Sequence, residues 1–80
     1  MMEVTIKGEM DANTLIAHHG TTVEAFCDGV LVDHCTRVNQ DEGWAEQIVM
    51  DPKTGLFEID QDAGRFVTRR VRGSITLVIP

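Results

Sequence analysis

The C-terminal run from Arg65 to Ile79 alternates apolar and polar residues, and it constrains the fold more than any other segment. A period of two is typical of a β-strand with one face toward a core and the other toward solvent. Fifteen residues in one straight strand would span about 50 Å, too long for so small a domain. We therefore predict that Gly73 bends or bulges the strand and divides it in two. The apolar positions are Val67, Val71, Ile75, Leu77 and Ile79, and the polar positions are Thr68, Arg70, Arg72, Ser74 and Thr76.

A hairpin is predicted around Asp28-Gly29, a dipeptide suited to a two-residue type I′ turn. Its strands would cover residues 22–27 and 30–38, with Cys27 opposite the first residue of the return strand. Two acidic residues would face each other in this register, so a shifted register with a longer loop stays open. If residues 30–38 form one continuous strand, Cys27 and Cys35 lie on opposite faces.

Turn signals divide the rest of the chain into further short elements. The whole pattern predicts a mainly β fold: a single β-rich domain over residues 1–80. We expect an antiparallel meander of about six strands that forms a small sandwich or barrel, with one short N-terminal helix. The expected elements are strands over residues 2–7, 44–50 and 56–59, a helix over 12–19 between an Asp11 cap and a Gly20 stop, a loop over 39–43, and turns over 51–55 and 60–64.

Charge is unevenly distributed along the chain, whose net charge is −6. Residues 1–64 hold thirteen acids and three basic residues, whereas residues 65–80 hold four arginines and no acid. An acidic body makes nucleic acid an unlikely partner, because phosphate binding needs a net positive face. No apolar stretch is long enough for a membrane span and no signal peptide is recognised, so we expect a soluble protein that is not secreted.

The sequence shows no pattern of a metal, cofactor or catalytic site. Cys27, His34 and Cys35 lack the C-x-x-C pairing of a zinc knuckle, and no phosphate-binding glycine loop is present. Ser74, the only serine, lies on the polar face of its strand, away from any predicted base. We therefore predict a protein that is not an enzyme, with no catalytic residues, no cofactor and no metal.

Five residues are candidates for contact with a partner: Trp44, Phe66, Arg69, Arg70 and Arg72. Trp44 is either a core residue or an interface residue, since tryptophan is common at binding hot spots. The arginines either pair with the acidic remainder of the domain or form a basic strip that faces a partner. Arg69 lies on the apolar face of its strand. It must therefore extend to solvent, pair with an acid, or lie where that face leaves the core.

Residues 28–80 resemble a group of short uncharacterised proteins encoded by tailed bacteriophages and prophages. The resemblance rests on turn and strand signals: Asp28-Gly29-Val30 with Cys35, Gly43-Trp44, Asp51 to Gly55, Asp60 to Gly64, Thr68, and the closing strand from Gly73 to Pro80. It implies a viral or prophage source and a location in the virion or the host cytoplasm. The group has no assigned catalytic residues, so none are carried over.

Two functions are compatible with these features. The first is a non-catalytic virion structural or morphogenesis accessory protein that acts by protein–protein contact, with a phage structural protein as partner and homo-oligomerisation as a further expectation. The alternative is a host-takeover or counter-defence inhibitor that binds a bacterial protein or a small signalling molecule. Its acidic surface could imitate nucleic acid to a basic host protein.

Overall fold

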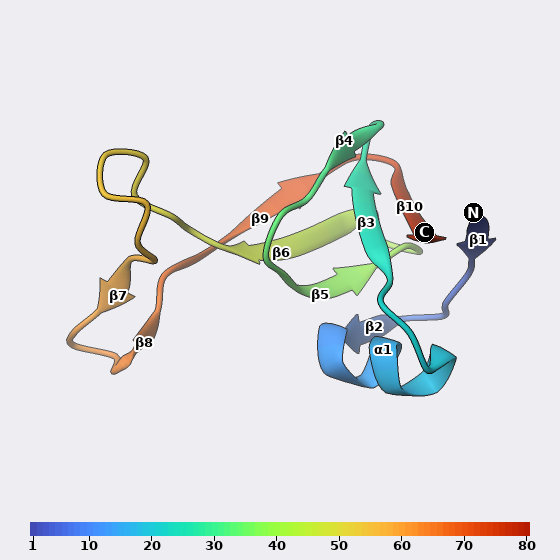
Figure 1. Ribbon diagram of the computed structural model, residues 1–80, viewed down its shortest axis with the longest axis horizontal. Helices are drawn as coiled ribbons and strands as arrows, with labels where there is room; N and C mark the ends of the chain where they lie inside the picture. Colours follow the sequence, from blue (N-terminus) through green and yellow to red (C-terminus); the bar gives the residue numbers. More distant parts are fainter.

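The computed structural model describes residues 1–80 as ten short strands and one helix (Figure 1). Every strand pair is antiparallel, so the predicted mainly β, antiparallel class with one N-terminal helix is confirmed. The elements are β1 (Met2–Val4), β2 (Glu9–Asp11), α1 (Ala12–His19), β3 (Glu24–Cys27), β4 (Val30–Leu31), β5 (Cys35–Asn39), β6 (Trp44–Ile48), β7 (Ile59–Asp60), β8 (Arg65–Phe66), β9 (Thr68–Arg72) and β10 (Ile75–Ile79).

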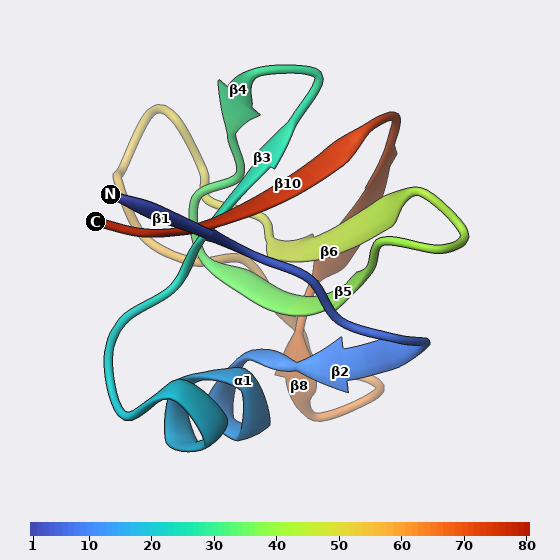
Figure 2. The same ribbon diagram turned by 90° about the vertical axis from the view of Figure 1, so that its right-hand side faces the viewer.

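Two four-stranded sheets form a small sandwich. The first sheet has the order β1-β10-β3-β4, the second has the order β2-β5-β6-β9, and β7 and β8 form a separate pair. The two ends of the chain are neighbours in the first sheet, where Met2 lies opposite Ile79 (Figure 2). Both sheets thus pair strands that are distant in sequence, and these pairings hold the two ends of the chain in the same sandwich.

The core lies between the sheets and is thin, with only eleven of the 80 residues buried. It draws on both sheets and on one side chain of α1, as expected for apolar-in, polar-out strands. Its largest fully buried side chains are Leu77 of the first sheet and Val38 of the second. The main apolar cluster consists of Ile6, Leu15, Ala25, Val32, Val38, Ala45, Ile75 and Leu77.

Gly73 divides the C-terminal run, as predicted. β9 ends at Arg72 in the second sheet, and β10 begins at Ile75 in the first. Asp28 fixes the crossing, because its N–H donates to the Ser74 carbonyl at 2.9 Å and its Oδ1 accepts from the Ser74 N–H at 2.8 Å. A Cβ at Gly73 would lie 2.7 Å from the Asp28 Cγ, so only glycine fits at this crossing.

The Asp28-Gly29 hairpin has the predicted register, with Cys27 opposite Val30. The continuous strand predicted over residues 30–38 is wrong, however. The chain leaves the first sheet at Val32 and enters the second at Cys35, and His34 between them has a left-handed φ of 55°. This break reorients the following residues, so Cys27 and Cys35 both pack against the core instead of lying on opposite faces.

Helix α1 covers the predicted residues. The Asp11 carboxylate accepts from the Thr14 N–H at 2.7 Å, and Gly20 ends the helix with a φ of 69° and a bond to the Ile16 carbonyl. Leu15 is the only buried residue of the helix, so α1 contributes one side chain to the core. No helix of the protein is long and apolar enough to span a bilayer.

Candidate binding surface

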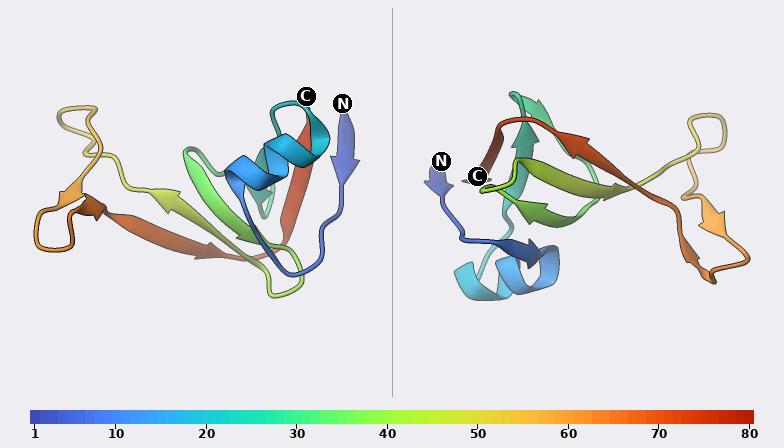
Figure 3. Two further views of the ribbon diagram at one scale, coloured as in Figure 1. Left: turned by 90° about the horizontal axis from the view of Figure 1, so that it is seen from below. Right: turned by 180° about the vertical axis from the view of Figure 1, so that it is seen from behind.

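Residues 49–67 leave the sandwich and form an arm that projects from one end of it (Figures 1 and 3). The arm makes the molecule 36 Å long and 23 Å across. It also raises the radius of gyration to 13.0 Å, against about 12 Å for a compact chain of this length. The remaining residues, 1–48 and 68–80, are called the body below.

Three backbone hydrogen bonds fix the base of the arm. Val49 donates to the Val67 carbonyl at 2.9 Å, Val67 to the Glu58 carbonyl at 2.9 Å, and Glu58 to the Val49 carbonyl at 3.0 Å. Beyond this base, the chain forms the two turns that the sequence predicts. Each turn closes with a 2.8 Å bond from its final glycine N–H to the carbonyl of its first aspartate, over residues 51–55 and 60–64.

The arm presents large apolar side chains to solvent. Leu56 is 68% exposed, Ile59 61% and Phe66 48%. Phe57 is partly covered, because its ring meets that of Phe66 edge to face with centroids 5.6 Å apart and that of His34 with centroids 4.8 Å apart. The contact between the Phe57 and His34 rings joins the arm to the body. Ile59 and Phe66 lie directly opposite each other in β7 and β8, so the outer part of the arm presents exposed apolar side chains on an anchored hairpin, which is typical of a contact site.

Trp44 is buried, with 2% of its surface exposed, but it lies outside the main apolar cluster. It is on the outer face of the second sheet, opposite Arg72 in β9. Its indole N–H donates to Glu42 Oε2 at 3.0 Å, and the Arg70 guanidinium lies 3.7 Å from the ring centroid. Trp44 therefore packs beneath the Arg70 side chain and has almost no surface of its own exposed to solvent.

Of the four arginines in β8 and β9, only one forms an ion pair with an acidic residue of the body. Arg70 alone forms an ion pair, at 3.6 Å from Glu46. Arg69 donates from Nε to Gln47 Oε1 at 2.7 Å and is exposed, whereas Arg72 has no carboxylate within 4 Å. The reading of Arg69 as half of a buried ion pair is therefore wrong, because its strand face has left the core where β9 approaches the arm.

A polar hollow of about 460 Å³ separates the arm from the body. Asp33, His34, Glu58 and Arg69 contribute its charged and polar lining. No group of three or more His, Cys, Asp or Glu side chains in the protein is arranged to hold a metal ion. The hollow thus brings together opposite charges from three segments that are distant in sequence.

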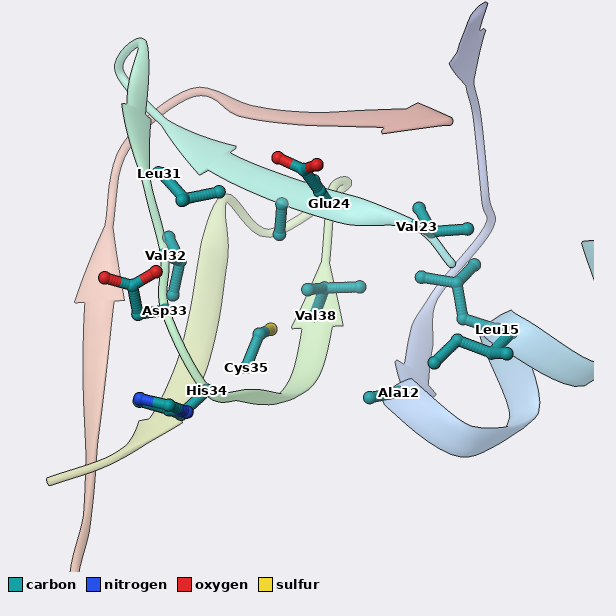
Figure 4. A pocket seen from close by; sticks show the side chains of 12 residues that line it. Ala12, Leu15, Val23, Glu24, Leu31, Val32, Asp33, His34, Cys35 and Val38 are labelled. Atoms are coloured by element: carbon teal, nitrogen blue, oxygen red, sulfur yellow. The ribbon is translucent and has the colours of Figure 1, made fainter. Parts of the chain in front are cut away.

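A second, more apolar pocket of about 330 Å³ lies between α1 and the β3–β4 hairpin (Figure 4). Leu15 and Val23 line one side and Val32 another, with Cys35 at its base. Burial raises the pKa of the Cys35 thiol to about 11, and nearby Glu46 adds to this effect. The thiol is therefore protonated at neutral pH and is poorly suited to act as a nucleophile.

Sequence reasoning named Phe66 and the arginines as candidate contact residues, but it missed the arm, the polar hollow and the contact of His34 with the arm. One signal for the arm was present, because the strand from Arg65 was too long for the domain. Its excess length could have been assigned to a projection as well as to a bend. The left-handed His34 has only a weak signal: histidine is enriched among non-glycine residues with a positive φ, but such residues are uncommon, and neither glycine nor asparagine marks that position.

Comparisons with known proteins identify no relative: no protein-family model, curated protein or solved structure matches the chain. The resemblance of residues 28–80 to proteins of tailed phages stays a prediction. The function proposed next rests on the surface features described above.

Proposed function

We propose that this protein is a non-catalytic binding module that attaches to a larger protein through its arm, and that it serves as a small virion structural or morphogenesis accessory protein of a tailed phage. The observation that carries the proposal is the exposed apolar surface of Leu56, Ile59 and Phe66 on an anchored hairpin. Burying such side chains against a partner contributes about 1.5–3 kcal/mol for each large side chain that becomes fully covered.

The form of the arm supports docking of a largely preformed element. Its base has three backbone bonds and its two turns are closed by further bonds, so little conformational entropy is lost on binding. The edge-to-face contact between Phe57 and Phe66 further restricts the hairpin. The sandwich would then act as the body that remains outside the partner.

The proposal is tested on particles purified from the strain that encodes the chain. Mass spectrometry should find the protein in stoichiometric amount in wild-type particles. The triple variant Leu56→Ser, Ile59→Ser and Phe66→Ser should fold, as judged by the fluorescence of Trp44, and be lost from particles. A matched control is Val30→Ser, which removes a side chain of the body that is 69% exposed, and should remain in particles.

Absence of the wild-type protein from particles, despite its expression, would refute the virion role. Retention of the folded triple variant at the wild-type copy number would refute docking through the arm. Both measurements come from one preparation, so the two parts of the proposal can fail separately.

A host-directed inhibitor is the second candidate, and the surface charge favours it. Ten of the thirteen acids are exposed, and residues 1–64 have a net charge of −10. Such a surface could occupy the nucleic-acid site of a basic host protein. Under this function, the protein would be absent from particles, and its binding to the host protein would weaken steeply with added salt.

A further inference from the structure

The second sheet has two free edges of opposite charge. Its order is β2-β5-β6-β9, so β2 lies at one edge and β9 at the other (Figure 3). β9 has three arginines and no acid, whereas β2 has the sequence Glu9-Met10-Asp11. All charged residues of both strands are exposed. Free edges of this kind offer backbone groups to any strand that matches them.

The backbone groups that β9 leaves free can be assigned from its flanking bonds. At one end of β9, the Val67 carbonyl accepts from the N–H of Val49, which directly follows β6, at 2.9 Å. At the other end, the Gly73 N–H donates to the carbonyl of Gly43, which directly precedes β6, at 3.0 Å. Bonded residues alternate along an antiparallel pair, so the odd positions between these two bonds also face β6. The N–H and C=O groups of Thr68, Arg70 and Arg72 therefore point away from the sheet.

The same alternation, followed from β9 across β6 and β5, shows which backbone groups of β2 are free. Met10 and Val38 form a hydrogen-bonded pair, so the backbone groups of Met10 point to β5. Glu9 and Asp11 then direct their N–H groups to the free edge. Asp11 is the N-cap of α1, so its carbonyl is not free to pair with another strand. The free edge of β2 is therefore short, and Glu9 is the residue whose N–H and carbonyl are both free to pair.

We propose that copies of this chain associate head to tail, with β9 of one copy pairing to β2 of the next and prolonging the second sheet. Successive strands of the sheet are all antiparallel, so β9 runs antiparallel to β2 and would extend the sheet in the same sense. The contact uses two different surfaces and leaves one of each free, so it can repeat. This association is independent of the arm.

One register matches charge and burial at three successive positions. It sets Arg72 opposite Glu9, Val71 opposite Met10, and Arg70 opposite Asp11. Val71 and Met10 are both half-buried and pack on the same core, so their apolar face would continue across the junction. Opposite charges on directly facing residues stabilise such a pair.

The available charges favour a second copy placed in this orientation. Arg72 has no carboxylate within 4 Å in its own chain, and the ion pair of Glu9 with Arg37, at 3.5 Å, is half exposed. Two β9 edges facing each other would set arginine against arginine, and two β2 edges would set acid against acid. Like charges directly opposite are destabilising, so the symmetric pairings are disfavoured.

The test is sedimentation velocity of the full chain at rising concentration, up to about 1 mM, because short edge contacts bind weakly. Wild type should form a concentration-dependent series of oligomers. Arg72→Glu and Glu9→Arg should each weaken association at least about tenfold. Their equimolar mixture, and the double variant Glu9→Arg with Arg72→Glu, should associate again because each junction regains opposite charges.

Matched controls carry the same charge changes away from the junction. Arg65→Glu, on the arm, and Glu3→Arg, on the first sheet, should associate as wild type does. A wild type that stays monomeric up to the highest concentration would overturn the proposal, as would single variants that associate normally or a mixture that does not recover. The arm triple variant should still associate, so failure of arm docking and failure of this contact are distinguishable.

Discussion

Replacing Gln40 with alanine should remove a link between the two sheets. Gln40 follows β5 of the second sheet, and its side chain reaches the first sheet. Its Oε1 accepts from the Ile6 N–H at 2.8 Å, and its Nε2 donates to the Ile75 carbonyl at 3.2 Å and to the Val4 carbonyl at 3.5 Å. Ile6 is only 7% exposed, so water cannot readily replace the lost acceptor.

The magnitude follows from these partners. Leaving the buried Ile6 N–H without an acceptor costs about 1–3 kcal/mol, and the lost bond to Ile75 adds about 1 kcal/mol. We therefore expect Gln40→Ala to lower the free energy of unfolding by about 2–4 kcal/mol. The total for a domain of this size is about 4–12 kcal/mol. The melting temperature should fall by at least about 8 °C.

Urea unfolding followed by the fluorescence of Trp44, the only tryptophan, measures this loss. Gln61→Ala is the matched control, because Gln61 is exposed in an arm turn and its side chain has no hydrogen bond; it should change stability by less than about 0.5 kcal/mol. If Gln40→Ala lost no more than this control, the link between the sheets would not exist in solution.

The isosteric variant Gln40→Glu separates hydrogen bonding from packing. It keeps the acceptor for Ile6 but sets a carboxylate oxygen against the Ile75 and Val4 carbonyls. These carbonyls disfavour the charged form, so the pKa of the new carboxyl should be higher in the folded protein than in the unfolded chain. The folded state then binds the proton more tightly. The lost stability should therefore return as the pH falls from the raised folded pKa toward the unfolded value of about 4.3, and the recovery should be complete below that value. A pH-independent loss would contradict this reasoning.

Three further predictions concern single side chains. Burial raises the pKa of Cys35 from its ordinary 9.0 to about 11, so the folded state holds its proton more tightly; stability should be complete below pH 9 and fall as the pH rises from 9 to 11. Cys35→Ala should lack this part of the fall in urea unfolding, and an identical pH slope would contradict it. Arg70→Ala should uncover the Trp44 ring, shift its emission to the red and cost about 1 kcal/mol, whereas an unchanged spectrum would show that Arg70 does not cover the ring. Arg69→Ala should cost less than about 0.5 kcal/mol, since its one bond, to Gln47, is exposed; a loss near 3 kcal/mol would indicate a buried pair instead.

Local patterns were sufficient for much of the fold. The Asp28-Gly29 register, the cap and stop of α1, and both arm turns all depend on interactions between residues close in sequence. The bend at Gly73 was predicted from strand length, but Asp28 fixes it through a contact between residues distant in sequence. Period-two alternation correctly predicted the β class, because each strand buries one face. The break at His34 was missed, because a histidine only weakly marks a left-handed backbone and no glycine stands at that position.

The candidate surface was only partly visible in the sequence. Phe66 was one of the candidate contact residues, and the structure leaves it 48% exposed. For Trp44 the two interpretations were core or interface. The structure buries it, in agreement with the first, but places it under Arg70 and outside the main apolar cluster. Its environment depends on Glu42 and Arg70, and the strand register that brings Arg70 to the ring is a long-range property.

By itself, the sequence determined the β class of the fold, most of the places where the chain turns, and the uneven distribution of charge along the chain. These properties depend on side-chain alternation and on backbone preferences within a few residues. Only the tertiary structure decided that β1 and β10 are neighbours, that Gln40 joins the sheets, and that β2 and β9 are the free edges of one sheet. Pairing between distant strands is selected by the total burial and hydrogen bonding of the whole chain, and no local segment contains that information.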